Sequence, residues 1–219
     1  MRVRKSLSAA AFVVVMDILG VGLVPAMSIM PQAAIAQTAS SSSPATAIEN
    51  LDSALLAVMK QGRQIPFQQR YATLAPAVEQ ALDLPGILRI SVGFAWSSMS
   101  REQQQQLLAA FRKYTIATYL DNFDSFNGQK FVVEPQTRQL ATGQNVVSTK
   151  IIPKNGSPHR LDYVMHRLPD GSWKAIDVLA EGTSRVAVQR SDWSALINQG
   201  GARALLATMH RKTQALEQG

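Results

Sequence analysis

The carboxylates that could carry out chemistry in this chain lie in the second strand of a predicted β-hairpin and just after it. Asp177 lies inside an apolar run, Glu181 comes just past its end, and Arg190 follows a few residues later. A carboxylate that points into an apolar pocket can act as a general base if its pKa is displaced. A carboxylate at the end of a strand more often stabilises a corner, here through hydrogen bonds or a pair with Arg190. We therefore predict a structural polar corner made by Asp177, Glu181 and Arg190, and keep catalysis by Asp177 or Glu181 as an alternative.

The other residue types that commonly carry out chemistry are sparse. Cysteine is absent, which excludes disulfides, thiolate metal ligands and a cysteine nucleophile. None of the three histidines, His159, His166 and His210, has a second ligand at metal-binding spacing. The sequence also contains no G-x-S-x-G motif, P-loop or dinucleotide fingerprint. We predict that the protein is not an enzyme and that it has no catalytic residue, no bound metal and no cofactor.

The charge of the chain argues against a nucleic-acid partner. Lys and Arg number 22 against 15 Asp and Glu, a net charge of +7, but no long basic run occurs. Nucleic-acid binding normally concentrates basic residues on one element, with aromatic residues between them. A diffuse positive charge suits loose attraction to anionic lipid head groups or to acidic partner surfaces.

An antiparallel sheet must position the polar corner. Apolar and β-branched runs separated by turn residues predict strands over 130–135, 145–152, 160–168 and 173–179. Pro169-Asp170-Gly171-Ser172 is turn chemistry between the last two strands. Because strand side chains alternate, Trp173 and Asp177 should share one face of the last strand, with Ile176 and Val178 on the other.

Helices are predicted before and after these strands. Asp83 should cap a helix that opens at Pro85, and Ser100 with Gln103 forms a capping box. The capping box begins a helix over 101 to about 123, and two earlier helices are predicted over 48–62 and over 67–82, the second with a kink or break at Pro76. C-terminal helices are predicted to start at Ser184 or Ser191, to break at Gly200-Gly201 and to end near Leu216. This order indicates an α+β fold, in which N-terminal helices pack on one face of a curved antiparallel meander sheet and C-terminal helices close it.

The N-terminus has the features of a secretory signal peptide. An apolar run from Leu7 to Met30 follows three basic residues, and Ala34-Ile35-Ala36 provides small residues before a cleavage point. A retained membrane anchor is the alternative. We predict a cleaved signal peptide over 1–36, a disordered Ser/Ala-rich tether over 37–46, and a single domain over 47–216.

Several of these residues fall in the order of a known family signature. They are Tyr163, Gly171-x-Trp173-Lys174, Asp177-Val178, Glu181-Gly182-x-Ser184, Arg190 and Trp193, with Asp83, Trp96-Ser97-x-Met99-Ser100, Gln103 to Phe111 and Tyr119 upstream. From Ile48 to Leu216 the chain resembles the MlaC (toluene-tolerance) family of periplasmic lipid-binding proteins, and most closely its hopanoid-associated HpnM branch. It departs from the family pattern at Trp193, where phenylalanine is usual, and at Gly93-Phe94-Ala95, where Leu-Gly precedes the tryptophan.

The resemblance implies an NTF2-like or MlaC-like fold with an apolar pocket between sheet and helices, and a single lipid-binding domain. It implies a soluble periplasmic protein that shuttles phospholipid or hopanoid between inner and outer membranes. Its partners would be an inner-membrane transporter complex of ABC or RND type and, in some systems, an outer-membrane lipoprotein complex. We expect a monomer. A periplasmic NTF2-like isomerase or hydratase, or a chaperone that uses the same groove, remains the alternative.

We predict a cavity at or above the upper end of the range of about 300–1,000 Å³ that is typical of ligand sites. The predicted lipid-binding residues are apolar or aromatic and come from the helices and strands on either side of the cavity. They are Phe94, Trp96, Phe111, Tyr114, Val147, Ile151, Tyr163, Met165, Ile176 and Val178.

Overall fold

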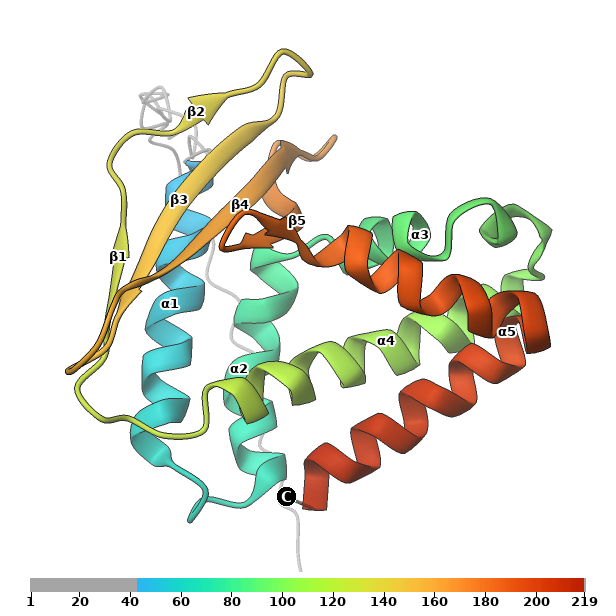
Figure 1. Ribbon diagram of the computed structural model, residues 1–219, viewed down its shortest axis with the longest axis horizontal. Coiled ribbons are helices and arrows are strands. Elements are labelled where there is room, and N and C mark those ends of the chain that lie inside the picture. The colour runs from blue at the N-terminus through green and yellow to red at the C-terminus, as the bar shows by residue number, and fades with distance from the viewer. Residues whose placement is uncertain (1–42, 219) are drawn as a thin grey trace, which may run out of the picture. The chain divides into compact units, whose positions relative to one another are not determined.

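The chain runs through helices first, strands next and a long helix last (Figure 1). The structure, a computed structural model, describes residues 43–218. The predicted signal peptide and residues 37–42 of the predicted tether lie outside these residues. The described elements are α1 (Pro44–Gln61), α2 (Phe67–Ala81), α3 (Leu84–Val92), the 3-10 helix η1 (Gly93–Ser98), α4 (Arg101–Asn122), β1 (Lys130–Val133), β2 (Arg138–Gln139), β3 (Asn145–Ile152), β4 (His159–Arg167), β5 (Trp173–Ala180), β6 (Thr183–Ser184) and α5 (Arg185–Gln218). This order confirms the predicted α+β fold.

Helix α1 begins inside the segment that we predicted to be a disordered tether. The Ser43 hydroxyl accepts a hydrogen bond from the Thr46 N–H at 3.1 Å, and Pro44 occupies the first turn. Serine at the N-cap and proline in the first turn both favour a helix start. The prediction of disorder is therefore wrong for residues 43–46.

The segment between α2 and α3 connects the helices to the sheet. Helix α2 continues through Pro76, so the proline does not end it. Leu82 then forms a parallel β-bridge with Ala175, and the Asp83 N–H donates to the Ala175 carbonyl at 2.9 Å. The Asp83 carboxylate accepts from the Gly86 N–H at 3.0 Å, which confirms the predicted cap of α3. Two adjacent residues therefore hold β5 against the start of α3.

The predicted caps and break of the later helices are confirmed. The Gln103 N–H donates to the Ser100 hydroxyl at 3.2 Å, and the Ser100 N–H donates back to the Gln103 side chain at 2.9 Å. The Ser184 hydroxyl accepts from the Ala187 N–H at 3.0 Å at the start of α5. Gly201 has a φ of 59° and divides α5 in two. The first half lies beside α3, and the second half returns along α4 (Figure 1).

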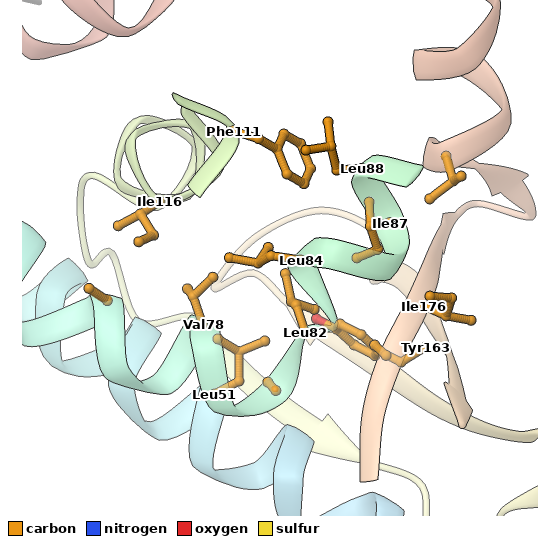
Figure 2. Packing of buried hydrophobic residues seen from close by; sticks show 14 of the residues in the cluster. Leu51, Val78, Leu82, Leu84, Ile87, Leu88, Phe111, Ile116, Tyr163 and Ile176 are labelled. Carbon is orange, nitrogen blue, oxygen red and sulfur yellow. The ribbon is translucent and has the colours of Figure 1, made fainter. Parts of the chain in front are cut away.

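The strands form one antiparallel sheet in the order β1-β3-β4-β5-β6, and β2 also pairs with β3. Val147 faces Tyr163 across β3 and β4, and Tyr163 faces Val178 across β4 and β5. Residues opposite one another in a sheet share a face, so these three side chains form one row. Figure 2 shows Tyr163 extending from the sheet toward Leu82 in the helical layer. Within residues 43–218, every helix is too short or too polar to cross a bilayer.

A β-bulge at Ile176 changes which side chains of β5 face the core. Val164 pairs with Asp177 but Met165 pairs with Ala175, so Ile176 is an extra residue in the ladder. Ala175 and Ile176 are consequently both buried, at 0% and 9% exposure. After the bulge, Val178 faces inward and Asp177 faces outward. The prediction that Trp173 and Asp177 share a face is therefore wrong, because it assumed unbroken alternation.

Candidate functional site

An open cavity of about 440 Å³ lies between the inner face of the sheet and the helices α4 and α5. The sheet contributes its apolar floor, which consists of Ile151, Leu161, Tyr163, Val178 and Ala180. The volume falls in the lower half of the range of about 300–1,000 Å³ for ligand pockets. Our prediction of a cavity at or above the upper end of that range is therefore wrong.

The floor residues are positioned by the pairing of β4 with β5. Leu161 faces Ala180, and Tyr163 faces Val178, so both pairs point to the same side of the sheet. This register depends on the bulge at Ile176, which turns the second half of β5 over. The small side chain of Ala180 leaves space at one end of the floor.

Helix α4 forms one wall of the cavity. Its lining residues recur every four positions, as expected for one stripe of a helix. The aromatic part of the stripe is continued by ring contacts: Tyr119 stacks on Phe123 at 6.0 Å between centroids, and Phe123 meets Phe131 of β1 at 5.8 Å. The wall consists of Tyr114, Thr115, Thr118, Tyr119, Asn122 and Phe123.

Helix α5 forms the opposite wall and carries most of the charge around the cavity. Val186 and Trp193 are buried, whereas Arg185, Asp192 and Lys212 are exposed. Lys212 also lies 6.0 Å from the centroid of the Tyr114 ring, at cation–π distance. The cavity therefore combines an apolar floor with polar and charged groups at its exposed edge. The lining residues from α5 are Arg185, Val186, Val188, Gln189, Asp192, Trp193 and Lys212, and α3 adds Ile87.

Burial disfavours the charged forms of three ionisable groups near the cavity, Tyr163, Tyr119 and Asp52. Burial raises the pKa of Tyr163 well above its usual value, and the neighbouring Tyr119 and Asp52 raise it further. Burial also raises the pKa of Tyr119. Asp52 of α1 is 5% exposed, and burial, assisted by Glu49, raises its pKa to about 7. A floor of neutral groups favours an apolar ligand, because a buried charge without a partner is costly.

The structure brings four of the ten predicted lipid-binding residues to the cavity. Tyr114, Ile151, Tyr163 and Val178 line it. Four others are buried in the close-packed core and do not line it. Phe111 makes an edge-to-face contact with Trp193 at 5.8 Å, and a Cβ added to Gly86 would come 2.6 Å from Ile176 Cδ1. These four residues are Phe111, Val147, Met165 and Ile176, with exposures between 0% and 9%.

The two remaining predicted residues lie in η1, away from the cavity. Phe94 is 92% exposed, so its placement in an apolar pocket is wrong. The physical reason is the turn at Gly93, where a φ of 69° ends α3. Trp96 is half-buried against the core and does not line the cavity either.

Asp177 lies at a corner where hydrogen bonds join β5 to α5, without the predicted partners Glu181 and Arg190. Its carboxylate accepts hydrogen bonds from the Ser184 hydroxyl at 2.5 Å, the Val186 N–H at 3.2 Å and the Val178 N–H at 2.7 Å. These bonds attach the outer face of β5 to the first turn of α5, where a negative charge is favourable. Asp177 does not line the cavity, so it is not placed to act as a base there.

The predicted pairing of Arg190 with Asp177 or Glu181 is wrong. The Glu181 carboxylate accepts from the Arg160 N–H at 3.0 Å and lies 3.6 Å from His159 Nδ1. Arg190 points the other way, toward η1, and an added Cβ on Gly93 would come 3.2 Å from its guanidinium. Across residues 43–218, no ion pair joins Arg190 to a carboxylate. Asp177 is already occupied by Ser184 and backbone donors, and the Arg190 guanidinium lies against Gly93 and Phe94 instead.

The sequence interpretation missed several lining residues. Tyr119 and Phe123 follow the predicted residue Tyr114 on the same helix, and Tyr119 also stands in the family signature, so both could have been found from the sequence. Leu161 is two residues before Tyr163 on the same strand face, and Trp193 stands in the family signature. The sequence around Arg185 and Lys212 does not show that they line the cavity, because their positions depend on how the two halves of α5 pack against the other helices and the sheet.

The lining chemistry offers little for catalysis. Among the described residues that line the cavity, Asp192 is the one carboxylate, and its side chain is exposed. Within residues 43–218, no group of three or more His, Cys, Asp or Glu side chains is arranged to hold a metal ion. The arrangement is suited to holding an apolar molecule whose polar end remains at the edge.

Comparison with known proteins agrees with this geometry. Residues 49–211 match the family model of the MlaC protein. Among solved structures, the chain is similar to the phospholipid-binding protein from Ralstonia solanacearum, determined in complex with a phospholipid. The two chains are 23% identical, with a TM-score of 0.68, over 79% of this chain and 98% of the other. Because the family match spans most of its length, this chain belongs to the MlaC family.

Proposed function

We propose that this protein is a periplasmic lipid carrier that holds the apolar part of a phospholipid in the cavity between sheet and helices. The observation that carries the proposal is the apolar floor of Ile151, Leu161, Tyr163, Val178 and Ala180, closed by two helical walls with a polar edge. Membership of the MlaC family supports it, as does the bound phospholipid of the similar Ralstonia solanacearum protein.

A carrier of this kind addresses a physical barrier. Each CH₂ group of a lipid tail that enters water costs about 0.8 kcal/mol, so an unassisted lipid does not cross an aqueous gap. When a lipid leaves the membrane, the apolar side chains of the cavity would contact part of its tails in place of the membrane interior. Its open side allows the polar head group to stay in water beside Arg185, Asp192 and Lys212.

The proposal extends to the cellular setting. A chain with a cleaved signal peptide over residues 1–36 would reach the periplasm and move lipid between the inner and outer membranes. An inner-membrane transporter complex of ABC or RND type would exchange lipid with it, together with an outer-membrane lipoprotein complex in some systems. Phospholipid is the ligand we favour, and a hopanoid is the alternative that the resemblance to the HpnM branch implies.

The test is to extract the purified full chain with organic solvent and to identify the lipids by mass spectrometry. We expect about one lipid per protein. Val178→Phe should reduce that amount strongly, because the larger ring occupies the floor of the cavity. Val132→Phe is the matched control, since Val132 is 41% exposed on the edge strand β1. The proposal would be refuted if the parent protein contained no lipid, or if Val178→Phe contained as much lipid per protein as Val132→Phe. Finding a hopanoid would change the ligand and leave the carrier role in place.

A further inference from the structure

The end of α3, η1 and the start of α5 form a surface with exposed apolar residues. We call Ile90, Phe94, Arg89 and Arg190 the η1 surface. Phe94 is 92% exposed and Ile90 is 39% exposed. Val188, which is 37% exposed, lies two residues before Arg190 on α5 and also lines the cavity. Among the described residues, these three account for most of the large apolar side chains that are exposed to solvent.

The local structure holds Phe94 in this exposed position. Gly93, with a φ of 69°, turns the chain out of α3 immediately before Phe94. The Arg190 guanidinium packs against Gly93 and lies 5.8 Å from the centroid of the Phe94 ring. An arginine beside an aromatic ring is a favourable cation–π arrangement. Phe94 is therefore presented to solvent by its neighbours, although an apolar ring of this size usually gains free energy from burial.

The charged members of the η1 surface, Arg89 and Arg190, are both basic, and the exposed acidic residues Glu102 and Asp192 lie just beyond its two segments. The segment 84–101 contains Arg89 and Arg101 and no acidic residue, and the segment 182–191 contains Arg185 and Arg190 and no acidic residue. The side chains of all four arginines are exposed. Exposed aromatic and aliphatic residues among basic residues are the combination that binds the interface of an anionic bilayer.

The η1 surface lies next to the cavity. Gln189 of α5 lines the cavity, and its side-chain amide donates to the Ser91 hydroxyl of α3 at 2.8 Å. The next residue, Arg190, contacts Gly93 and Phe94. A membrane in contact with Phe94 would therefore be close to the wall of the cavity that α5 forms.

We propose that the η1 surface docks the protein on an anionic lipid bilayer, with Phe94 inserted at the interface and the arginines on the head groups. Only the purpose of docking, which is lipid exchange, rests on the proposed carrier function. The docking itself depends on Phe94, Ile90 and the arginines, none of which except Arg185 lines the cavity. It also gives a role to Phe94, for which the cavity has none.

The test measures binding of the full chain to phosphatidylcholine vesicles with and without phosphatidylglycerol, by co-sedimentation. We expect binding only when the anionic lipid is present, and weaker binding at higher salt, because salt screens the attraction. Phe94→Ala should weaken binding about tenfold, since an inserted phenylalanine loses its apolar contact. Arg190→Gln should weaken it about fivefold, the contribution of one basic residue near an anionic surface.

Phe126→Ala is the matched control for Phe94→Ala. Phe126 is 40% exposed and also lies near a cation, Lys60 at 5.4 Å, but it is outside the cavity and the η1 surface. We expect the control to bind vesicles like the parent. Equal binding by Phe94→Ala and Phe126→Ala would overturn the proposal and would favour a protein partner for Phe94.

The lipid content of the same proteins separates this proposal from the proposed function. Phe94→Ala should keep the amount of co-purifying lipid found in the parent, because Phe94 does not line the cavity. If the parent binds anionic vesicles through Phe94 but contains no lipid, docking stands and the carrier role falls. If Phe94→Ala loses its bound lipid and keeps its affinity for vesicles, Phe94 is a ligand residue and the docking proposal is wrong.

Discussion

The same three strands form two halves of one sheet face, and one half is filled while the other is hollow. In the filled half, Val147, Met165 and Ala175 are 0% exposed. In the hollow half, Leu161 and Val178 line a cavity of about 440 Å³. The residue types do not differ in character, because both halves are apolar. The difference must therefore come from the helices that cover them.

The covering helices differ in how closely they approach the sheet. In the filled half, a β-bridge from Leu82 to Ala175 places the α2–α3 junction directly on β5, and a Cβ added to Gly86 would come 2.6 Å from Ile176 Cδ1. Figure 2 shows Leu82 of this junction beside the ring of Tyr163, at the border with the hollow half. In the hollow half, α4 and α5 present large rings and long polar chains, and the attachment of α5 to β5 is at its start, through β6 and Asp177. The comparison teaches that the hollow is created by the approach of the helices and not by the strands.

The largest expected effect is on the filled half. Met165→Ala should lower the free energy of unfolding by about 2–5 kcal/mol, because it leaves a cavity where the core cannot collapse. Leu161→Ala removes a side chain of the hollow half that is already partly free, so its cost should be clearly smaller. Urea unfolding of both variants checks this. Equal losses would mean that the two halves are packed alike.

The second effect concerns Asp52, whose charge influences both tyrosines under the cavity. Burial raises its folded-state pKa from 3.8 to about 7. The folded chain thus holds this proton more tightly than the unfolded chain, so the stabilising contribution is complete below about pH 4 and is lost as the pH rises through 7.

Asp52→Asn should accordingly raise the free energy of unfolding by about 4 kcal/mol at about pH 8 and change it much less at about pH 4. Urea unfolding across this pH range measures the difference. A parent whose stability does not fall between these pH values would contradict the assignment of a raised pKa to Asp52.

A third experiment places the same substitution in each half. Ala175→Leu should destabilise the protein by about 1–3 kcal/mol, because it overpacks a filled core. Ala180→Leu lies on the same strand but extends into the cavity, so its stability should stay within about 0.5 kcal/mol of the parent while bound lipid decreases. Thermal unfolding and lipid extraction give the two readouts. An Ala180→Leu variant as unstable as Ala175→Leu would show that the hollow half has no free space.

The smallest expected effect is at the corner that attaches α5 over the hollow half. Asp177→Asn keeps one acceptor but loses the charge beside the first turn of α5, so it should cost about 1 kcal/mol. Lipid identity should not change, because Asp177 does not line the cavity. Loss of a turnover activity at unchanged stability would instead revive the enzyme alternative.

Local sequence signals predicted the positions of the helices and strands well, but they predicted less well which side chains face the cavity. The capping box of Ser100 and Gln103, the cap at Asp83 and the break at Gly201 are all present, because each depends on residues within one turn. The start of α1 was missed because a Ser-rich composition outweighed the single cap at Ser43.

The candidate site was predicted in part. Tyr114 and Tyr163 were found because they occupy regular positions of a helix stripe and of a strand face. Val178 was assigned to the pocket on the assumption of unbroken alternation, but it faces the cavity because of the bulge at Ile176. Phe94 was misplaced because its direction depends on the backbone turn at Gly93 and on the packing of Arg190 from α5. Neither contact is visible in the sequence near Phe94. Tertiary packing, which local periodicity does not encode, decides such positions.

The bulge at Ile176 decides which one-residue deletions in β5 the cavity floor can absorb. Deleting Ile176 would leave Ala175 opposite Met165 and Asp177 opposite Val164, so the pairing with β4 would become regular and Val178 would still face the cavity. The loss would be the buried Ile176 side chain, which lies beside Gly86. Deleting Val178 instead would bring Leu179 opposite Tyr163 and move Ala180 off the floor. Two neighbouring codons of the same strand therefore differ in what their loss does: one deletion damages the packed core, and the other replaces the floor of the cavity.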